Sequence, residues 1–259
     1  MMLRMASKKE ITRRLAQELK RTARLEKQLL WLYGQQNKMI AEKYTSLLSK
    51  YLKDGKFIKN FNTNQDMNLF LEELKKASEL LAMESTQLTT NLLIAEYTRV
   101  AVQTYKDLGM RAPSFLYSKD YVRRMVEANF KDGKKFSERI WGNTTRMEEK
   151  LRSTLNEALA SGEAIPTTVR KFSNITGQGY NEVRRVIRTE TVATYNRSSL
   201  DTYIALGIEE VSVLGKQANI CPLCLAHEGD IVKTSEATIG TNIPPFHPND
   251  RCTIVPVIK

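Results

Sequence analysis

The sequence predicts a mainly helical protein with a small β subdomain at its C-terminus, an α+β arrangement. Before Pro113 the chain has no proline and only three glycines, in a stretch rich in Leu, Lys, Glu and Gln, and this composition is typical of long helices. After Gly207 short runs of β-branched residues replace the helical pattern, and such runs are typical of strands. We therefore expect a long N-terminal helical hairpin, followed by a helical domain that is capped by a knuckle of short strands.

Two long helices are expected in the N-terminal region, at about residues 8–52 and 64–108. Apolar side chains recur at helical spacing in both. They are Ile40, Tyr44, Leu47, Leu48 and Tyr51 in the first helix and Leu74, Ala77, Leu81, Leu88 and Leu92 in the second. The stretch "KDGKFIKNFNTNQD" between the helices contains Gly55 and three asparagines, which indicates a turn. Long helices joined by a short turn predict an antiparallel hairpin whose apolar stripe is a packing seam.

Proline and glycine divide the rest of the chain. The stretch "GMRAPSF" is typical of a helix end, so we divide the chain into a basic long-helix region, 1–112, and a second domain, 113–259. Helices are expected at about 118–129, 135–160 and 181–206. A short helix is expected to begin near Pro166, which suits a first turn, and to end at Gly177 and Gly179.

The last part of the chain predicts short strands. The stretches "EEVSVLG" and "TIVPVIK" are rich in β-branched residues. The tripeptide Glu228-Gly229-Asp230 lies between apolar residues and indicates a turn. We expect these elements to form the small β cap, with the knuckle at 221–252.

The net charge of +11 is concentrated near the N-terminus. Residues 1–56 hold 14 basic and 5 acidic residues, a balance of +9. Such a segment suits nucleic acid, an anionic membrane or an acidic protein surface, and a solvated helix face with a basic tail is the alternative. We take double-stranded DNA, contacted without sequence preference, as the expected partner. The candidate DNA-binding residues are Lys8, Lys9, Arg13, Arg14, Lys20, Arg21 and Arg24.

Composition narrows the class of protein. Apolar residues make up 41% of the chain and charged residues 27%, as in ordinary globular proteins. No apolar run reaches the length that crosses a bilayer, and the start "MMLRMASKKEITRR" lacks the apolar segment of a secretory signal. Three cysteines do not suit a disulfide framework. We therefore expect synthesis in a reducing cytoplasm.

All three cysteines and both histidines lie in the last fifth of the chain. A C-x2-C pair is followed by an H-x4-C pair, and zinc takes four tetrahedral thiolate or imidazole ligands. The intervening stretch is mostly polar, so metal binding would supply folding free energy that a core cannot. The predicted ligands of this closed structural zinc site are Cys221, Cys224, His247 and Cys252. His227 ranks second as a ligand, and the alternative is three reduced cysteines packed as small apolar side chains.

Few residues suit catalysis. H-E-x-x-H, the P-loop, G-x-S-x-G and the dinucleotide fingerprint are absent. Zinc deaminases carry H-x-E before P-C-x-x-C, whereas His227-Glu228 follows the cysteines here, and Glu190 and Glu228 lack a partner constellation. We expect no enzymatic activity and no small-molecule substrate. The alternatives are a zinc-containing enzyme acting on nucleic acid or nucleotide, and a membrane-active delivery protein with a basic amphipathic helix.

Three stretches together resemble a known family: "VIRTETVATYNRSSLDTYIALGI", "CPLCLAHEGDIV" and "PPFHPNDRCTIVPV". They are similar to the phage minor head proteins, the Mu F-like head morphogenesis proteins of tailed bacteriophages, over about residues 141–259. That family shows an R-T-E helix with a downstream Asn, a C-P-x-C followed by a Gly-containing turn, and P-P-x-H-P-x-C-R-C running into P-V. The matching structural residues are Arg188, Thr189, Glu190, Asn196 and Gly229.

One position departs from the family's pattern. Asp250 stands where the family has a cysteine, while the four predicted zinc ligands are kept. We expect Arg188 and Asn196 to tie their helix to the strand layer through charge-assisted hydrogen bonds. Simple surface salt bridging, which contributes little to stability, is the alternative.

The resemblance implies a minor virion protein, made in the bacterial host cytoplasm and located in the inner head at the portal vertex. The implied partners are the portal protein and capsid or scaffold proteins, and the implied role is in head assembly and in DNA packaging or delivery. Some related domains are fused to toxin enzymes. Because the chain ends two residues after the final "PV", we expect no appended enzyme.

Overall fold

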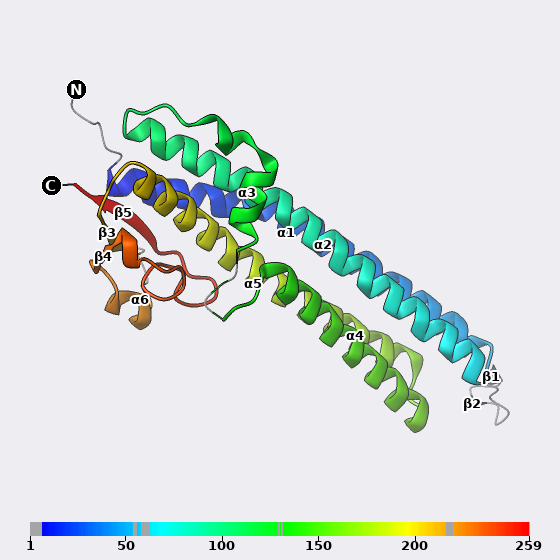
Figure 1. Cartoon of the computed structure of the whole chain (residues 1–259). Helices are drawn as coiled ribbons and strands as arrows, with labels where there is room; N and C mark the ends of the chain where they lie inside the picture. The colour runs from blue at the N-terminus through cyan, green and yellow to red at the C-terminus, as the bar shows by residue number, and fades with distance from the viewer. Residues whose placement is uncertain are drawn as a thin grey trace. The chain divides into compact units, whose positions relative to one another are not determined.

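The computed structural model describes residues 7–53, 56–57, 63–128, 130, 132–215 and 220–258. It confirms a mainly helical chain that ends in a small antiparallel sheet (Figure 1). The four long helices are α1 (Lys8–Ser49), α2 (Thr63–Asp107), α4 (Phe136–Ser161) and α5 (Ile165–Ala205). The short helices are η1 (Ser114–Tyr117), α3 (Lys119–Val126), α6 (Pro222–Ala226) and η2 (Thr234–Glu236). The strands are β1 (Leu52–Lys53), β2 (Lys56–Phe57), β3 (Glu210–Leu214), β4 (Ile231–Lys233) and β5 (Thr253–Val257).

Local sequence signals set the ends of the first two helices. Ser7 and Glu10 form a capping box at the start of α1, because each side chain accepts the other's backbone N–H, at 2.8 and 3.3 Å. At the end of α2, Gly109 adopts φ +70°, and the Met110 N–H donates to the Tyr105 carbonyl. Glycine suits this left-handed position. The centre of the predicted turn between these helices, around Gly55, lies outside the described residues.

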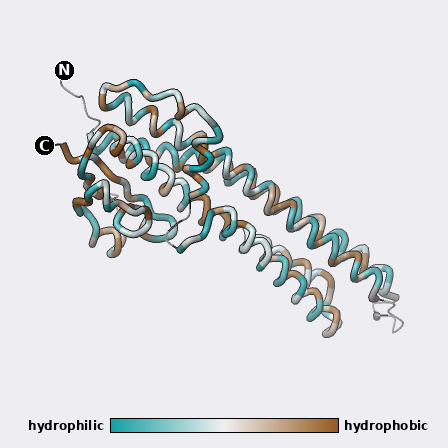
Figure 2. The backbone as a smooth tube through the Cα atoms, viewed as in Figure 1, coloured by the Kyte–Doolittle hydropathy of each residue, from teal (hydrophilic) through white to brown (hydrophobic). Residues whose placement is uncertain are grey.

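The chain divides into two compact units. One comprises Met1–Leu25, Leu88–Phe136 and Arg185–Lys259, and the other comprises Glu26–Gln87 and Ser137–Arg184. Each unit therefore contains segments from both sides of residue 112. Helices α1, α2 and α5 contribute to both units, and polar and apolar residues alternate along them (Figure 2).

Helices α1 and α2 run antiparallel, as the hairpin prediction requires (Figure 1). In the unit that contains Glu26–Gln87, the Gln36 amide donates to the Ser78 hydroxyl at 3.1 Å. In the other unit, Arg99 pairs with Glu18 at 2.6 Å. Among the described residues, no helix has the length and apolar character that a membrane span requires.

The unit that contains Glu26–Gln87 and Ser137–Arg184 is built from parts of α1, α2, α4 and α5. Its core contains aromatic pairs in edge-to-face contact, a favoured geometry. The Tyr44 and Phe172 rings lie 5.2 Å apart, and those of Tyr33 and Tyr180 lie 6.0 Å apart. The interior is also polar: the Asn37 amide, for example, donates to the Ser173 hydroxyl at 3.0 Å.

The expected break between two helices at Gly177 and Gly179 was wrong, because α5 continues through both glycines. The reason lies in packing. A Cβ on Gly179 would lie 2.6 Å from Met147 Sδ of α4, whereas a Cβ on Gly177 would meet nothing within 4 Å. Gly179 therefore permits close approach of the two helices, and the glycine signal reports helix contact, not a helix end.

The three-stranded sheet belongs to the unit that contains Arg185–Lys259. Strand β3 is central and pairs antiparallel with β4 and β5. Pro256 lies on β5, an edge strand, where its missing N–H is tolerated. Val211 and Ile254 pack in one apolar cluster with Leu200 and Tyr203 of α5. Strands β3 and β5 confirm the two predicted strands, whereas β4 and α6 were not predicted.

Replacing the two glycines of α5 tests the close approach. Gly177→Ala should raise the free energy of unfolding by about 0.5–1 kcal/mol, because alanine favours a helix over glycine. Gly179→Ala should lower it by about 1 kcal/mol, because its Cβ overlaps the Met147 side chain. Urea unfolding of the two variants provides the comparison. Equal stabilisation by both substitutions would show that the packing of α4 against α5 does not require glycine at position 179.

Candidate metal centre

Two thiols and one imidazole converge next to the sheet. The Sγ atoms of Cys221 and Cys224 each lie 3.1 Å from Nε2 of His247. Cys224 is buried, and the other two side chains are half-buried. Three of the four predicted zinc ligands therefore meet in one cluster.

The start of α6 brings the two cysteines together. Cys221 is the N-cap residue, and its Sγ accepts the Cys224 N–H at 3.4 Å. Pro222 occupies the first helical turn, where a missing N–H costs little. This local turn places both thiols on the side that faces His247.

A backbone contact orients His247. Its Nδ1 lies 2.9 Å from the Pro248 carbonyl oxygen. A carbonyl only accepts hydrogen bonds, so we assign the proton to Nδ1, which leaves the lone pair of Nε2 directed toward the two thiols. Fixing the tautomer through the second ring nitrogen is the usual arrangement for a metal-binding histidine.

A second group of possible ligands adjoins the first. Cys224, Asp250 and Cys252 are all buried, and their ligand atoms lie within 4.8 Å of one another, as do those of Cys221, Cys224 and His247. Cys224 belongs to both groups. Cys252, the fourth predicted ligand, therefore lies close to Cys224 but does not belong to the group that contains His247.

The pKa values of the two thiols move in opposite directions. The backbone N–H of Cys224 is the main cause that lowers the pKa of Cys221. Burial, followed by the Cys252 and Cys221 side chains, raises the pKa of Cys224. A bound metal cation would instead lower the pKa of Cys224, because metal coordination deprotonates a thiol.

The donor set fits a tetrahedral soft-metal site. Zinc bonds of about 2.0–2.3 Å place neighbouring ligand atoms about 3.5 Å apart, and the observed separations of 3.1 Å are close to this. Cys221, Cys224 and His247 would supply three ligands, and Cys252 or Asp250 the fourth.

Asp250 organises the loop that carries His247. Its two carboxylate oxygens accept the backbone N–H groups of Phe246, at 2.7 Å, and Cys252, at 2.8 Å. The Cys224 thiol lies 3.4 Å from the same carboxylate. Asp250, the residue that departs from the family pattern, is therefore a buried acceptor of backbone hydrogen bonds in this loop. The sequence signal was available, because Asp commonly accepts the N–H two residues on.

Asn196 ties α5 to the C-terminal segment. It is fully buried, and its amide donates to the carbonyls of Pro244 and Cys252, both at 3.1 Å. Its own carbonyl oxygen accepts the Thr253 hydroxyl at 2.9 Å. This buried amide thus makes three hydrogen bonds to the strand β5 and the loop before it.

The remaining residues of the predicted structural motif have separate positions. The Thr189 hydroxyl accepts the Asn249 N–H at 3.1 Å, and this contact holds the same loop from α5. Glu190 is buried, and Arg188 lines a cavity next to the loop. Gly229 adopts φ +84° in the predicted turn, and its N–H donates to the Val213 carbonyl of β3.

His227, the second-ranked ligand, lies beside the cluster. Its ring stacks on Phe246 with centroids 4.2 Å apart, and Nδ1 lies 2.9 Å from Asp230. Neither ligand group includes it. His227 therefore contacts the loop, and His247 is the histidine of the cluster.

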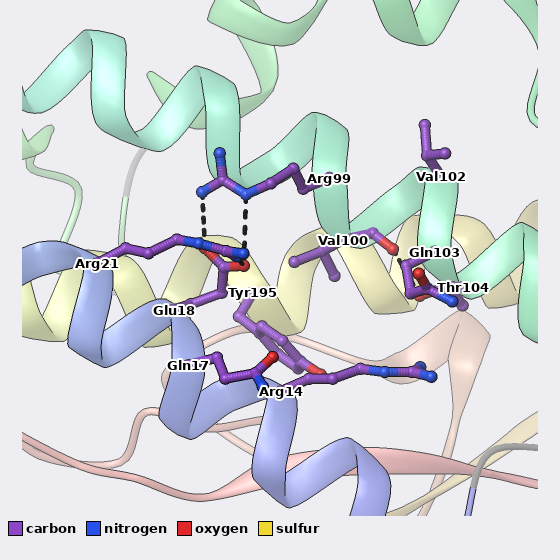
Figure 3. A pocket seen from close by; sticks show the side chains of 10 residues that line it. All are labelled: Arg14, Gln17, Glu18, Arg21, Arg99, Val100, Val102, Gln103, Thr104 and Tyr195. Carbon is purple, nitrogen blue, oxygen red and sulfur yellow. Dashed lines mark hydrogen bonds and ion pairs between the residues drawn. The ribbon is translucent and has the colours of Figure 1, made fainter.

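The seven predicted DNA-binding residues fall into two groups. Arg14 pairs with Asp107. Arg21 pairs with the buried Glu18, which also pairs with Arg99 (Figure 3). The other five are exposed along α1: Lys8, Lys9, Arg13, Lys20 and Arg24.

Burial, followed by the charge of nearby Glu18, raises the pKa of the carboxyl of Glu96.

Comparison with known proteins gives one result. A sequence model described as "Phage Mu protein F like protein" matches residues 149–255, less than half of the chain. The matched segment contains the R-T-E helix, α6 and the loop with His247. Searches of curated proteins and of solved structures found no match.

Proposed function

Because residues 149–255 match the Phage Mu protein F like family, as the sequence predicted, we propose that the chain is a minor structural protein of a tailed-phage head. It associates with the portal and the inner capsid and assists head morphogenesis and DNA packaging or delivery. The family match carries this proposal. The described surfaces support it, because they offer sites for docking.

The Cys/His cluster supports a structural role without catalysis. In catalytic zinc sites, three protein ligands leave one position for water. Here the side chains of Cys252 and Asp250 adjoin Cys224, so the protein has side chains available for a fourth ligand position. We propose a closed zinc site that stabilises the C-terminal segment. Its apolar neighbours are few, and they form a small cluster of Val213, Cys224, Phe246 and Cys252.

The two histidines of the chain provide a matched test of the zinc site. Native mass spectrometry of the purified protein should find about one zinc ion per chain. His247→Ala should lose the ion and lower the melting temperature, because metal binding contributes folding free energy. His227→Ala, which removes a ring next to the cluster, should keep the ion. Metal-free native protein whose unfolding is unchanged by chelators would contradict the proposal.

An exposed stripe on α1 supports contact with DNA. Lys9, Arg13, Lys20 and Arg24 are spaced four, seven and four residues apart, so they share one face of the helix. At 1.5 Å per residue the stripe is about 22 Å long. The neighbouring acid Glu18 is turned inward and paired. A row of lysines and arginines at this spacing suits sequence-independent contact with phosphates.

Salt dependence tests the DNA contact. Four phosphate contacts predict that affinity for a random duplex falls on the order of a hundredfold between about 50 and 200 mM salt. Replacing the four stripe residues by alanine should remove most of this dependence. Four exposed cations elsewhere provide a control of equal charge: Lys106, Arg111, Arg123 and Arg124. Equal effects of both quadruple variants would show only a net-charge effect, and absence of duplex binding would reject the DNA contact.

The head role is tested by particle composition. Quantitative mass spectrometry of purified phage heads and tails should find the chain in heads, at few copies relative to the major capsid protein. Deleting its gene should reduce the yield of DNA-filled heads and leave tails intact. Absence of the chain from heads at every assembly stage would reject the proposed function.

A further inference from the structure

The cavity that Arg188 lines lies beside the loop that carries His247. It has a volume of about 320 Å³ and is bounded by α1, α5 and residues 249–251. All of these segments belong to the same compact unit. On the α1 side its wall consists of Leu15, Ala16 and Leu19, which are apolar, and of Thr12 and Lys20. The wall is thus suited to an apolar side chain.

Three cations line the same cavity, each from a different element. Lys20 comes from α1, Arg188 from α5 and Arg251 from the C-terminal loop. The lining also includes Asp250, but both of its carboxylate oxygens accept backbone N–H groups of the loop. Its negative charge is therefore directed into the loop, and Lys20 and Arg251 give the lining an excess of positive charge.

Hydrogen bonds fix the loop side of the cavity. The Asn249 N–H donates to the Thr189 hydroxyl at 3.1 Å, and Asn249 itself adopts φ +61°. Asp250 donates its N–H to the His247 carbonyl at 3.2 Å. These contacts hold the backbone next to Arg251, so the cavity is pre-formed, which lowers the entropic cost of binding.

We propose that this cavity docks an acidic segment of a partner protein that carries an apolar anchor. The anchor lies against Ala16 and Leu19, and carboxylates beside it pair with Lys20 and with the planar guanidinium group of Arg251, which binds a carboxylate in bidentate fashion. The inference deepens the docking role and rests on the proposed function for the kind of partner, another protein of the head.

The cavity suits a peptide better than a nucleic acid. A DNA backbone offers phosphates to Lys20 and Arg251 but no side chain that would cover Ala16 and Leu19. An acidic-apolar peptide satisfies both parts of the lining.

Fluorescence anisotropy with the full-length chain tests the inference. The probe is a fluorescein-labelled peptide of alternating glutamate and leucine, seven residues long. Saturable binding is expected, and replacing its leucines by serine or its glutamates by glutamine should weaken binding about tenfold or more. Absence of saturable binding, or equal affinity for all three peptides, would overturn the proposal.

Variants locate the binding to the cavity. Arg251→Ala should weaken peptide binding about tenfold, and Ala16→Glu should abolish it, because it adds bulk and a negative charge to the exposed wall. Arg185→Ala removes an equal charge from an exposed position on α5 and should leave binding unchanged. Melting temperatures within about 2 °C of the wild type confirm that the variants are folded. Equal losses with Arg185→Ala and Arg251→Ala would overturn the proposal.

A competition arm separates the partner classes. Lys20 belongs both to the stripe and to the cavity lining, so the competition is run in a variant in which Lys9, Arg13 and Arg24 are alanine. Random duplex DNA at the same charge concentration should not displace the peptide from this variant. Direct binding of the duplex that Arg251→Ala weakens as much as it weakens peptide binding would assign the cavity to nucleic acid and overturn the proposal. The head role is judged separately by particle composition, so the chain can be found in heads while the peptide test fails.

Discussion

The buried amide of Asn196 is the contact on which the C-terminal part of the structure depends. Its two N–H groups bind the Pro244 and Cys252 carbonyls, and its oxygen accepts the Thr253 hydroxyl. Each buried partner left unsatisfied would cost about 1–3 kcal/mol. Because Asn196 lies on α5, one helix position fixes the start of β5 and both ends of the loop that carries His247.

The metal centre is built on this fixed loop. Helix α6 can bring Cys221 and Cys224 together through its own N-terminal turn, but His247 must be delivered from 23 residues beyond Cys224. Asp250 gives the loop its shape by accepting two backbone N–H groups. Thus the polar contacts of Asn196 and Asp250 pre-arrange the ligands, and the bound metal proposed here would lock an arrangement already formed.

The same loop links the centre to a surface. Arg251 follows Asp250 directly and lines the cavity proposed to bind an acidic peptide. A residue that shapes the metal loop therefore also positions a docking residue. Under the proposed function, this coupling would connect the Cys/His knuckle to a docking surface.

Sequence reasoning succeeded where the signal is local and periodic. The long helices and the strands β3 and β5 follow from composition and spacing, and the cysteine–histidine gathering follows from motif order. It failed at Gly177 and Gly179, because a glycine that permits contact with Met147 has the same local signature as one that ends a helix. It also missed the role of Asp250, although the hydrogen bond from the Cys252 N–H two residues on is a local pattern; only its contact with the Cys224 thiol depends on distant parts of the chain. Cavities between α1, α5 and the loop depend on tertiary packing, which no local pattern reports.

Amide hydrogen exchange of the loop tests the central claim most directly. In the wild type the N–H groups of Phe246 and Cys252 should be strongly protected, because both donate to a buried carboxylate. In Asn196→Ala both should lose most of this protection, whereas Asn37→Ala, which removes the contact to Ser173 in the other unit, should leave them unchanged. Full protection of Phe246 and Cys252 in Asn196→Ala would contradict the account.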